Sequence, residues 1–528
     1  MTTPTFPHGD SAGTLLGHPK GLFVLFFAEL WERFSYYGMR ALLVFYLTKH
    51  FLLSDQEAGW VYGAYTSLVY ITPLLGGYIA DRYLGQRKAV LFGGVMIAIG
   101  HILLGLEGDG GQDAFALNAF WTALAFIIVG TGFLKANISA IVGQLYPRDD
   151  TRRDPAYTLF YMGINVGGLL GPIICGILGE TVGWSYGFGA AAVGMIAGII
   201  VFVWGKPLLL GRGEPPKPDF LASKIGGVLS REWLIYVLAF ASVAVIFYLV
   251  QNHDAVGALL VVSSAVVVVY LLWDSFTKMD RIERHRMFAI LFLVSLNPLF
   301  WGLFEQAGSS LSLYTDRHVD RSIFGVVVPA SVFQSVNSLF IILMAPIMAA
   351  LWIKLGKRGI EPSTPAKFGL ALVQLGLGFL VFSLGALAFG TSNLTPVFFL
   401  IALTFLHTTG ELCLSPVGLS AMSKLAPARI VSLIMGVWFL ATAAGDFIAG
   451  LIAGFIGAQT ASATDKVLAT LTVYQYVGGL ALGVGVVVLA VSPFVKRLMH
   501  VDVLHDTPVS VADELAPQPI DGMPAKLN

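Results

Sequence analysis

The sequence predicts an all-α membrane protein that crosses the bilayer many times. Of its 528 residues, 56% are hydrophobic and only 12% are charged, and the mean hydropathy is +0.77. Soluble domains carry about 25% charged residues. The chain also divides into fourteen apolar runs of roughly 18–30 residues, each long enough to cross a bilayer as a helix. We therefore expect fourteen transmembrane helices in contact with lipid.

Short polar loops separate the expected spans, which follow one another from residue 21 to residue 497. Runs of this length and hydropathy, interrupted by Gly, Pro and charged residues, are typical of membrane helices. The predicted spans are 21–48, 57–80, 88–106, 117–143, 156–178, 185–206, 232–251, 256–276, 286–314, 322–353, 366–389, 395–424, 430–456 and 470–497.

The distribution of Lys and Arg predicts the orientation of the spans. Loops after even-numbered spans are basic, as in 82–88 and 354–358, whereas 107–113 and 179–183 have no Lys or Arg. By the positive-inside rule both termini are then cytoplasmic. Lys49 and the two arginines within 316–321 fit this rule less well.

The spans fall into two groups of six around an insertion. The runs 234–250 and 256–273 are almost free of charge, and polar stretches flank them, which indicates an inserted helical hairpin. The segments 80–88 and 351–358 are weakly similar, as expected of two related halves around a central cavity. The predicted units are 1–206 (six-helix bundle), 207–285 (linkers and hairpin), 286–498 (six-helix bundle) and 499–528 (disordered cytoplasmic tail).

The first span carries charged residues along one face. At 100° per residue, four polar side chains fall within about 60° of arc and two more flank them. A charge that faces lipid costs roughly 2.5–3.5 kcal/mol or more, so this face must point to a polar cavity. A surface helix with a solvated face is the alternative, and the many similar runs disfavour it. The face comprises Glu29, Arg33, Tyr36 and Arg40, flanked by Glu32 and Tyr37.

Few other ionisable residues lie deep inside a predicted span. They are Lys135, Glu305, His407, Glu411 and Asp446. With a rise of about 1.5 Å per residue, Arg40 and Glu305 both lie roughly 28 Å from the cytoplasmic end, Lys135 roughly 12 Å and Glu411 roughly 20 Å. Arg40 can therefore meet Glu305 toward the outside, and Lys135 can meet Glu411 toward the inside. Each pair would join the two halves.

These pairs have two interpretations. They act as gates that open alternately, or they are static links between helices, because a buried ion pair by itself is weak evidence for stability. Leaving Asp446 aside, the charges inside the spans are four carboxylates and three cations: Glu29, Glu32, Glu305, Glu411, Arg33, Arg40 and Lys135. One bound proton would make this group of residues neutral, so protons are a plausible driving ion. Asp446 is either a further member of the site or a group hydrogen-bonded between helices. His407 either shares the proton of Glu411 or is satisfied locally.

Aromatic and amide side chains could complete the cavity. Each alone is better explained by packing or by anchoring at the membrane interface, but together with the paired charges they suit a ligand with a positive and a negative end. They are Tyr70, Tyr161, Asn165, Trp301, Phe304, Asn337, Ser415 and Trp438.

Five segments resemble the signature motifs of the proton-dependent oligopeptide transporter (POT) family of the major facilitator superfamily. The first is Glu29-x-x-Glu32-Arg33-Phe-x-Tyr-Tyr-Gly, and the match extends in order over about residues 20–440. The others are 76–88, 160–168, 300–306 and 410–416. The inserted hairpin is also usual in bacterial members, so the resemblance implies a major facilitator fold in the inner membrane.

The resemblance implies import of di- and tripeptides with protons, by alternating access. Arg33 and Lys135 would face the peptide carboxylate and Glu411 the peptide amino group, while Arg40–Glu305 would form the outer gate and Lys135–Glu411 contact the inner one. The implied proton-coupling residues are Glu29, Glu32, Arg33, Lys135, Glu305 and Glu411. The implied substrate-binding residues are Arg33, Tyr36, Tyr37, Arg40, Tyr70, Lys135, Tyr161, Asn165, Trp301, Phe304, Asn337, Glu411, Ser415 and Trp438. Animal members carry a histidine on the second helix that 59–80 lacks, so coupling here should depend on carboxylates.

Other functions are less well supported. A carrier of the same fold could move another small anion, such as nitrate or a conjugated metabolite. A membrane enzyme would need a metal-spaced histidine cluster, a nucleophile elbow or a phosphate loop, and the sequence has none of these. Charged pairs at both ends of a cavity also disfavour an open channel. We therefore expect no enzymatic activity, no cofactor or metal, no nucleic acid and no required protein partner.

Overall fold

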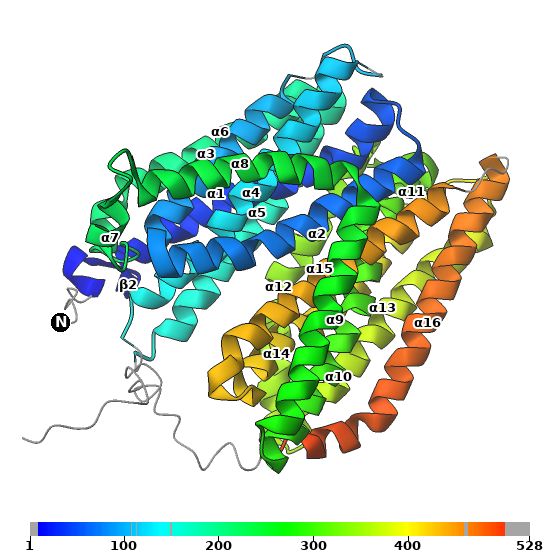
Figure 1. Ribbon diagram of the computed structural model, residues 1–528. Helices are drawn as coiled ribbons and strands as arrows, with labels where there is room; N and C mark the ends of the chain where they lie inside the picture. The colour runs from blue at the N-terminus through cyan, green and yellow to red at the C-terminus, as the bar shows by residue number, and fades with distance from the viewer. Residues whose placement is uncertain (1–8, 107, 112, 148–149, 459–462, 502–528) are drawn as a thin grey trace, which may run out of the picture.

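The computed structural model describes residues 9–106, 108–111, 113–147, 150–458 and 463–501, and it is almost entirely helical (Figure 1). Twelve of its helical segments are long and apolar enough to cross a membrane. Two more helices of similar length, α1 (Lys20–Phe45) and α2 (Asp55–Ile79), complete fourteen within the described residues. The all-α polytopic fold is confirmed. The predicted tail lies outside the described residues from 502 onward.

The helices follow the predicted spans closely. The first half consists of α1 and α2 with α3 (Gln86–Leu104), α4 (Ala114–Gln144), α5 (Arg153–Thr181) and α6 (Trp184–Trp204). The connecting region holds α7 (Pro218–Ala222), α8 (Arg231–Gln251) and α9 (His253–Thr277). The second half contains α10 (Arg281–Phe304), α11 (Ser310–His318), α12 (Ser335–Lys357), α13 (Thr364–Phe389), α14 (Val397–Leu425), α15 (Val431–Gly457) and α16 (Ala463–Leu498).

Short helices and strands connect these elements. The π-helical turns η2 (Tyr46–His50) and η3 (Ala80–Leu84) extend α1 and α2. The 3-10 turns are η1 (Gly9–Ala12), η4 (Lys206–Leu209), η5 (Glu305–Gly308), η6 (Ala330–Gln334) and η7 (Ala428–Ile430). Two-residue strands form small ladders: β1 (Thr14–Leu15) with β2 (His18–Pro19), β3 (Lys224–Ile225) with β4 (Leu229–Ser230), β5 (Val319–Asp320) with β8 (Thr395–Pro396), and β6 (Ser322–Ile323) with β7 (Val326–Val327).

The predicted tenth span, 322–353, begins too early. The structure places the antiparallel β6–β7 ladder there, and α12 starts only at Ser335. Phe324 and Gly325 adopt φ of 51° and 81°, a left-handed conformation that a helix cannot contain. The predicted start was wrong because the residues on both sides of this turn are apolar, so hydropathy alone does not show where the turn lies.

The first half is held together by close contacts between α1 and α5. A Cβ on Gly167 would lie 2.3 Å from the carbonyl oxygen of Leu30, and one on Gly171 would lie 2.5 Å from that of Phe34. Only glycine permits this approach. The backbone of α1 is thereby fixed against α5, which sets the direction of its charged face.

The two halves meet along α2 and α15. A Cβ on Gly63 would lie 2.7 Å from Cα of Gly450, and a Cβ on Gly59 would lie 2.7 Å from N of Gly454. We call this contact the glycine seam. Within the second half, α13 packs against both α14 and α16 around buried residues such as Phe379 and Phe382.

The inserted helices do not pair along their length. Figure 1 shows α8 lying along the first half and α9 along the second, and they diverge from their junction near Asn252. Both are largely exposed to the surroundings of the protein, as expected for helices that face lipid. They carry none of the ionisable residues predicted to form the site.

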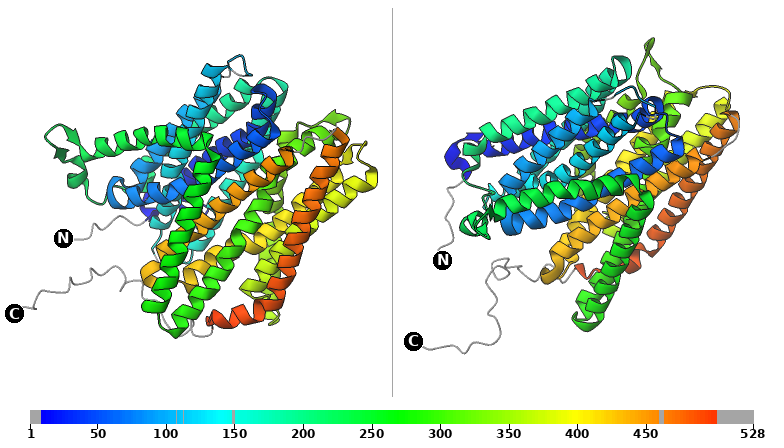
Figure 2. Two further views of the ribbon diagram at one scale, coloured as in Figure 1. Left: turned by 45° about the vertical axis from the view of Figure 1, so that its right-hand side comes forward. Right: turned by 45° about the horizontal axis from the view of Figure 1, so that its top comes forward.

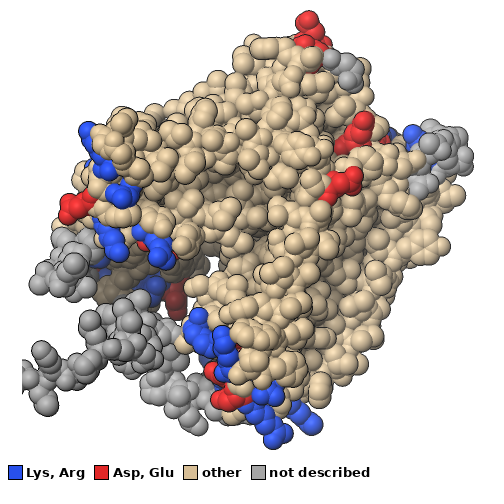
Figure 3. Space-filling model, in the orientation of Figure 1, with Lys and Arg blue, Asp and Glu red and all other residues tan. Residues whose placement is uncertain are grey.

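The halves touch at one end and separate toward the other (Figures 1 and 2). The closed end contains η2, the start of α2 and α11. The open end contains the start of α1 and the end of α16. A space-filling view shows a hollow between the halves toward the open end, with Lys and Arg on both sides (Figure 3). The hollow between the halves therefore opens toward this end.

Candidate transport site

The charged face of α1 points into the protein. The side chains of Glu29, Glu32 and Arg33 are buried. Nε of Arg33 lies 3.2 Å from Oε1 of Glu29 and also pairs with Glu32, and the guanidinium lies 5.1 Å from the ring centroid of Tyr36. One oxygen of each carboxylate and Nη2 of Arg33 have no partner among the described residues. The cluster can therefore accept a proton or a ligand without breaking an existing contact.

Arg40 and Glu305 form an ion pair across the two halves, as predicted. Nη1 of Arg40 lies 3.0 Å from Oε2 of Glu305, and the Tyr62 hydroxyl donates a 2.6 Å hydrogen bond to the same oxygen. Cα of Gly308 lies close to the Tyr62 hydroxyl, since a Cβ there would be only 2.0 Å from it. The sequence analysis missed Tyr62, although a phenol in the apolar run 57–80 was a detectable signal. These contacts tie α1, α2 and η5 together at the closed end.

Lys135 and Glu411 are not in contact. Nζ of Lys135 lies 3.6 Å from the ring centroid of Tyr70 on α2, whereas Oε2 of Glu411 accepts a 3.1 Å hydrogen bond from Asn337. The predicted pairing is absent from this conformation because the halves are apart toward the open end. Neither group forms an ion pair among the described residues.

Several predicted lining residues surround a small cavity near the ion pair. Its volume is about 40 Å³, and its lining includes Arg40, Phe304, Glu305, Asn337 and His407. A larger cavity of about 220 Å³ lies between α2, α11, α15 and α16 at the closed end, away from the charged cluster. The structure thus brings Phe304 and Asn337 together with the outer pair.

The remaining predicted residues divide between cavity and packing. Tyr161 and Ser415 are partly or fully exposed, and the ring of Tyr37 lies 5.1 Å from the guanidinium of Arg40. Asn165 is buried and donates to the carbonyl of Tyr161 one turn earlier. Trp438 is buried against Gly418 and Phe368 within the second half, so the structure gives it a packing role. Trp301 is partly buried, and its Nε1 has no partner among the described residues.

The structure decides between the alternatives for two residues. Nε2 of His407 lies 3.1 Å from the carbonyl oxygen of Leu375, which favours local satisfaction over proton sharing with Glu411. Asp446 is buried, and neither of its oxygens has a hydrogen-bond partner in the described part of the chain. The interpretation of Asp446 as hydrogen-bonded between helices is therefore wrong.

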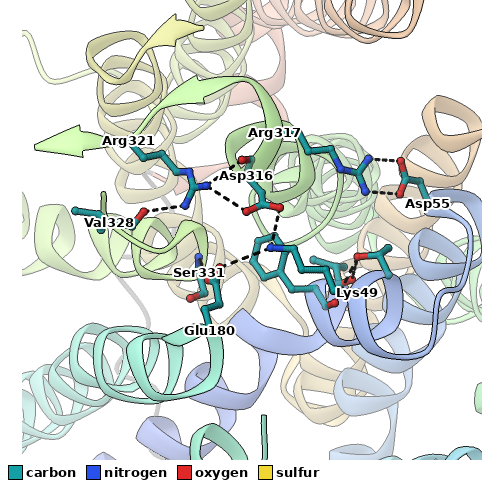
Figure 4. Close-up of polar contacts among 11 residues, drawn as sticks. Lys49, Asp55, Glu180, Asp316, Arg317, Arg321, Val328 and Ser331 are labelled. Carbon is teal, nitrogen blue, oxygen red and sulfur yellow. Dashed lines mark hydrogen bonds and ion pairs between the residues drawn. The ribbon is translucent and has the colours of Figure 1, made fainter. Parts of the chain in front are cut away.

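A second layer of ion pairs lies at the closed end, beyond Arg40 and Glu305 (Figure 4). Nζ of Lys49 lies 2.8 Å from Oδ2 of Asp316, and both terminal guanidinium nitrogens of Arg317 donate to Asp55. Arg321 also contacts Asp316. Acidic partners therefore offset the basic residues that fitted the positive-inside rule poorly. Sequence reasoning noted the aspartates beside the arginines of 316–321, but it missed the pairs Lys49–Asp316 and Arg317–Asp55 because these partners lie far apart in the chain.

Glu180 links this layer to η6. Its Oε1 accepts a 2.9 Å hydrogen bond from the backbone N–H of Ser331, and its Oε2 lies 3.8 Å from Nζ of Lys49 (Figure 4). Ser331 belongs to η6 of the second half, whereas Glu180 and Lys49 belong to the first. Every ion pair between the halves that the described residues form lies at the closed end.

The comparisons with known proteins agree with this architecture. A sequence profile described as "PTR2: POT family" matches residues 87–470. The chain belongs to the POT family. The major facilitator fold inferred from the sequence motifs is thus confirmed, although the profile match begins after the charged face of α1.

Relatives and solved structures of POT proteins extend the similarity over nearly the whole chain. An "Uncharacterized transporter YclF" of Bacillus subtilis is 39% identical, covering 92% of this chain and 95% of its own. A "Di-/tripeptide transporter" of Lactococcus lactis is 35% identical, covering 92% and 97%. A crystal structure of a mutant of a peptide transporter POT in complex with alafosfalin has a TM-score of 0.79 and 36% identity, covering 92% and 97%.

Proposed function

We propose that this protein imports di- and tripeptides together with protons by alternating access. The observation that carries this proposal is the asymmetry of the charged pairs. Arg40 and Glu305 are paired at the closed end, whereas Lys135 and Glu411 are not paired with each other. An importer that exposes its site to one side at a time needs such an arrangement.

The charges in the cavity suit a short peptide. A free peptide carries a carboxylate at one end and an ammonium at the other. Arg33 and Lys135 lie on the first half and Glu411 on the second, so a peptide that bridges the halves can satisfy both signs. The name of the Lactococcus lactis relative and the bound alafosfalin in the related structure support this substrate class.

Carboxylates would couple peptide to proton. Glu29, Glu32 and Arg33 form one buried cluster, and Glu305 belongs to the outer pair. The charge of Glu305 holds Arg40, so the outer gate depends on this carboxylate. One proton moving down about 100 mV supplies roughly 2.3 kcal/mol, and one pH unit about 1.4 kcal/mol. These energies suffice for a peptide gradient of several hundred-fold.

The orientation we propose places both termini in the cytoplasm and the closed end outside, in the inner membrane of a bacterium. Basic residues gather around the open end on the visible face (Figure 3), whereas those of the closed end are offset by Asp55 and Asp316. The positive-inside rule then assigns the open end to the cytoplasm. The described conformation is an inward-open one.

Uptake into proteoliposomes tests the proposal. Purified protein is reconstituted, and labelled dialanine uptake is measured with and without an inward proton gradient. We expect accumulation that requires the gradient and that unlabelled di- and tripeptides suppress but free alanine does not. Folded protein that accumulates no peptide would contradict the proposal and favour a carrier of another small anion, for which nitrate and conjugated metabolites are the next substrates to test.

A further inference from the structure

The mid-span carboxylate of Asp446 has no role in the mechanism described so far. It lies on α15, its exposed fraction is 1%, and neither oxygen receives a hydrogen bond from any described residue. An ionised carboxylate that is buried without a partner costs several kcal/mol. A protonated carboxyl group avoids most of this cost. The conformation described here therefore favours the neutral form of the group.

Asp446 lies at the inner limit of the glycine seam. It is four residues, or about one turn, before Gly450, whose backbone touches that of Gly63. On the side of α10, a Cβ on the adjacent Gly445 would lie 2.7 Å from Cβ of Trp301. Contacts of α15 with α2 and with α10 therefore lie within about one turn of Asp446. The seam contacts of Gly450 and Gly454 lie on the closed-end side of Asp446.

No cation on the surrounding elements neutralises this carboxyl group in the described structure. Arg40 of α1 and Lys135 of α4 act on it electrostatically, as do Glu305 of η5 and the phenols of Tyr36 and Tyr70. Arg40 is already paired with Glu305 and Lys135 lies on the Tyr70 ring. Several other titratable groups of the elements packed on α15 have partners elsewhere: Tyr62 with Glu305, Glu411 with Asn337, His407 with Leu375, Asp274 with Arg429, His253 with Trp60, Arg317 with Asp55 and Tyr474 with Ser310. The buried hydroxyl of Tyr65 on α2 has no partner among the described residues.

We propose that Asp446 is a proton-binding site that is loaded when the glycine seam opens and that must be neutral for the seam to close. The inference rests on the alternating access of the proposed function. In the opposite conformation α2 and α15 part, and water at the closed end delivers a proton to a carboxylate oxygen of Asp446. Closure then buries a neutral group. Without the proton, closure buries an unpaired charge and is disfavoured.

The charge of Asp446 and the charge of Glu305 have opposite effects on closure of the outer end. The negative charge of Glu305 stabilises the closed end because it holds Arg40. The negative charge of Asp446 opposes closure because nothing holds it. Neutralising substitutions at the two positions should therefore shift the same equilibrium in opposite directions.

Distance measurements between spin labels at the closed end test the proposal. Val182 and Leu394 are exposed, lie on opposite halves and can be replaced by labelled cysteines, while the native Cys175 and Cys413 are buried. Distances are measured in lipid nanodiscs between pH 5 and pH 8. For the otherwise unchanged protein we expect the short-distance population to rise as the pH falls. For Asp446→Asn we expect a mainly short distance at every pH, with at least a fivefold smaller pH response.

The variant Glu305→Gln provides the comparison of opposite sign, with a reduced short-distance population at pH 8. A pH response of Asp446→Asn equal to that of the parent protein would overturn the inference, as would a parent protein without any response. If Asp446→Asn does not fold, Asp446→Glu replaces it, and an unchanged midpoint in that variant overturns the inference. Dialanine uptake by the parent preparation is measured in parallel, so a failure of the proposed function is recognised separately.

Discussion

At the scale of single residues, charges buried between the halves define the site. Arg33 is held by two glutamates on its own helix, whereas Arg40 is held by Glu305 of the opposite half. Lys135 forms no ion pair among the described residues and lies instead over the ring of Tyr70. A cation over such a ring gains about 0.5–2 kcal/mol. Lys135 is therefore the cation most readily recruited by an incoming carboxylate.

We expect Lys135→Ala to abolish proton-driven peptide uptake, with a loss of at least tenfold, because the cavity loses its available cation. Uptake of labelled dialanine into proteoliposomes measures the effect. Lys88→Ala is the matched control, since Lys88 pairs with Glu232 outside the cavity, and its uptake should stay within about twofold of the parent. Full uptake by folded Lys135→Ala would refute the role given to this lysine.

Tyr62 offers a second prediction at this scale. Tyr62→Phe removes one hydrogen bond to a charged group, which is worth about 1.5–3 kcal/mol. We expect the population closed at the outer end to fall by about tenfold or more, as measured by the same label distance. Tyr65→Phe is the control, because the buried hydroxyl of Tyr65 has no partner among the described residues. Equal effects of both substitutions would show that the hydrogen bond to Glu305 does not hold the gate.

At the scale of elements, glycines set how closely the helices approach. The contacts of Gly167 and Gly171 fix α5 on α1, and those of Gly63 and Gly450 fix α2 on α15. The first pair lies within one half and keeps the charged face of α1 in place. The second pair lies between the halves, so this contact must break and re-form in every transport cycle.

Gly450→Ala should prevent tight closure of the seam. Its Cβ would lie 2.5 Å from Cα of Gly63, and overpacking of this kind typically costs about 1–3 kcal/mol. We expect dialanine uptake to fall about tenfold and the outer label distance to increase. Gly479→Ala on α16 is the control, because nothing lies within 4 Å of its added Cβ. Normal uptake by Gly450→Ala would mean that the seam tolerates displacement.

At the scale of the whole molecule, the two halves are joined by ion pairs at one end and are separate at the other. In the outer ion pairs the basic side chains of Lys49 and Arg317 are each 41% exposed. Exposed ion pairs contribute only about 0–1 kcal/mol each. Such a layer holds the closed end shut without making its opening slow.

A charge exchange tests the contribution of this layer. Arg317→Asp places two carboxylates opposite each other at the position of the pair with Asp55, and we expect the closed population to fall by up to about fivefold. Adding Asp55→Arg should restore it. Distances between outer labels at Val182 and Leu394 measure both variants. Failure of the second substitution to rescue the first would show that the pair itself does not contribute.

The amino-acid sequence was sufficient to predict the number of spans, the division of charge between loops and spans, and the outer pair of Arg40 and Glu305. These follow from hydropathy and helical rise, which are local properties of the chain. The tertiary structure decided that Lys135 and Glu411 are apart, that Tyr62 joins the outer pair and that Asp446 has no partner. The sequence could not supply these facts, because they depend on how two rigid halves are tilted relative to each other. That tilt is a property of the conformation and not of any single helix.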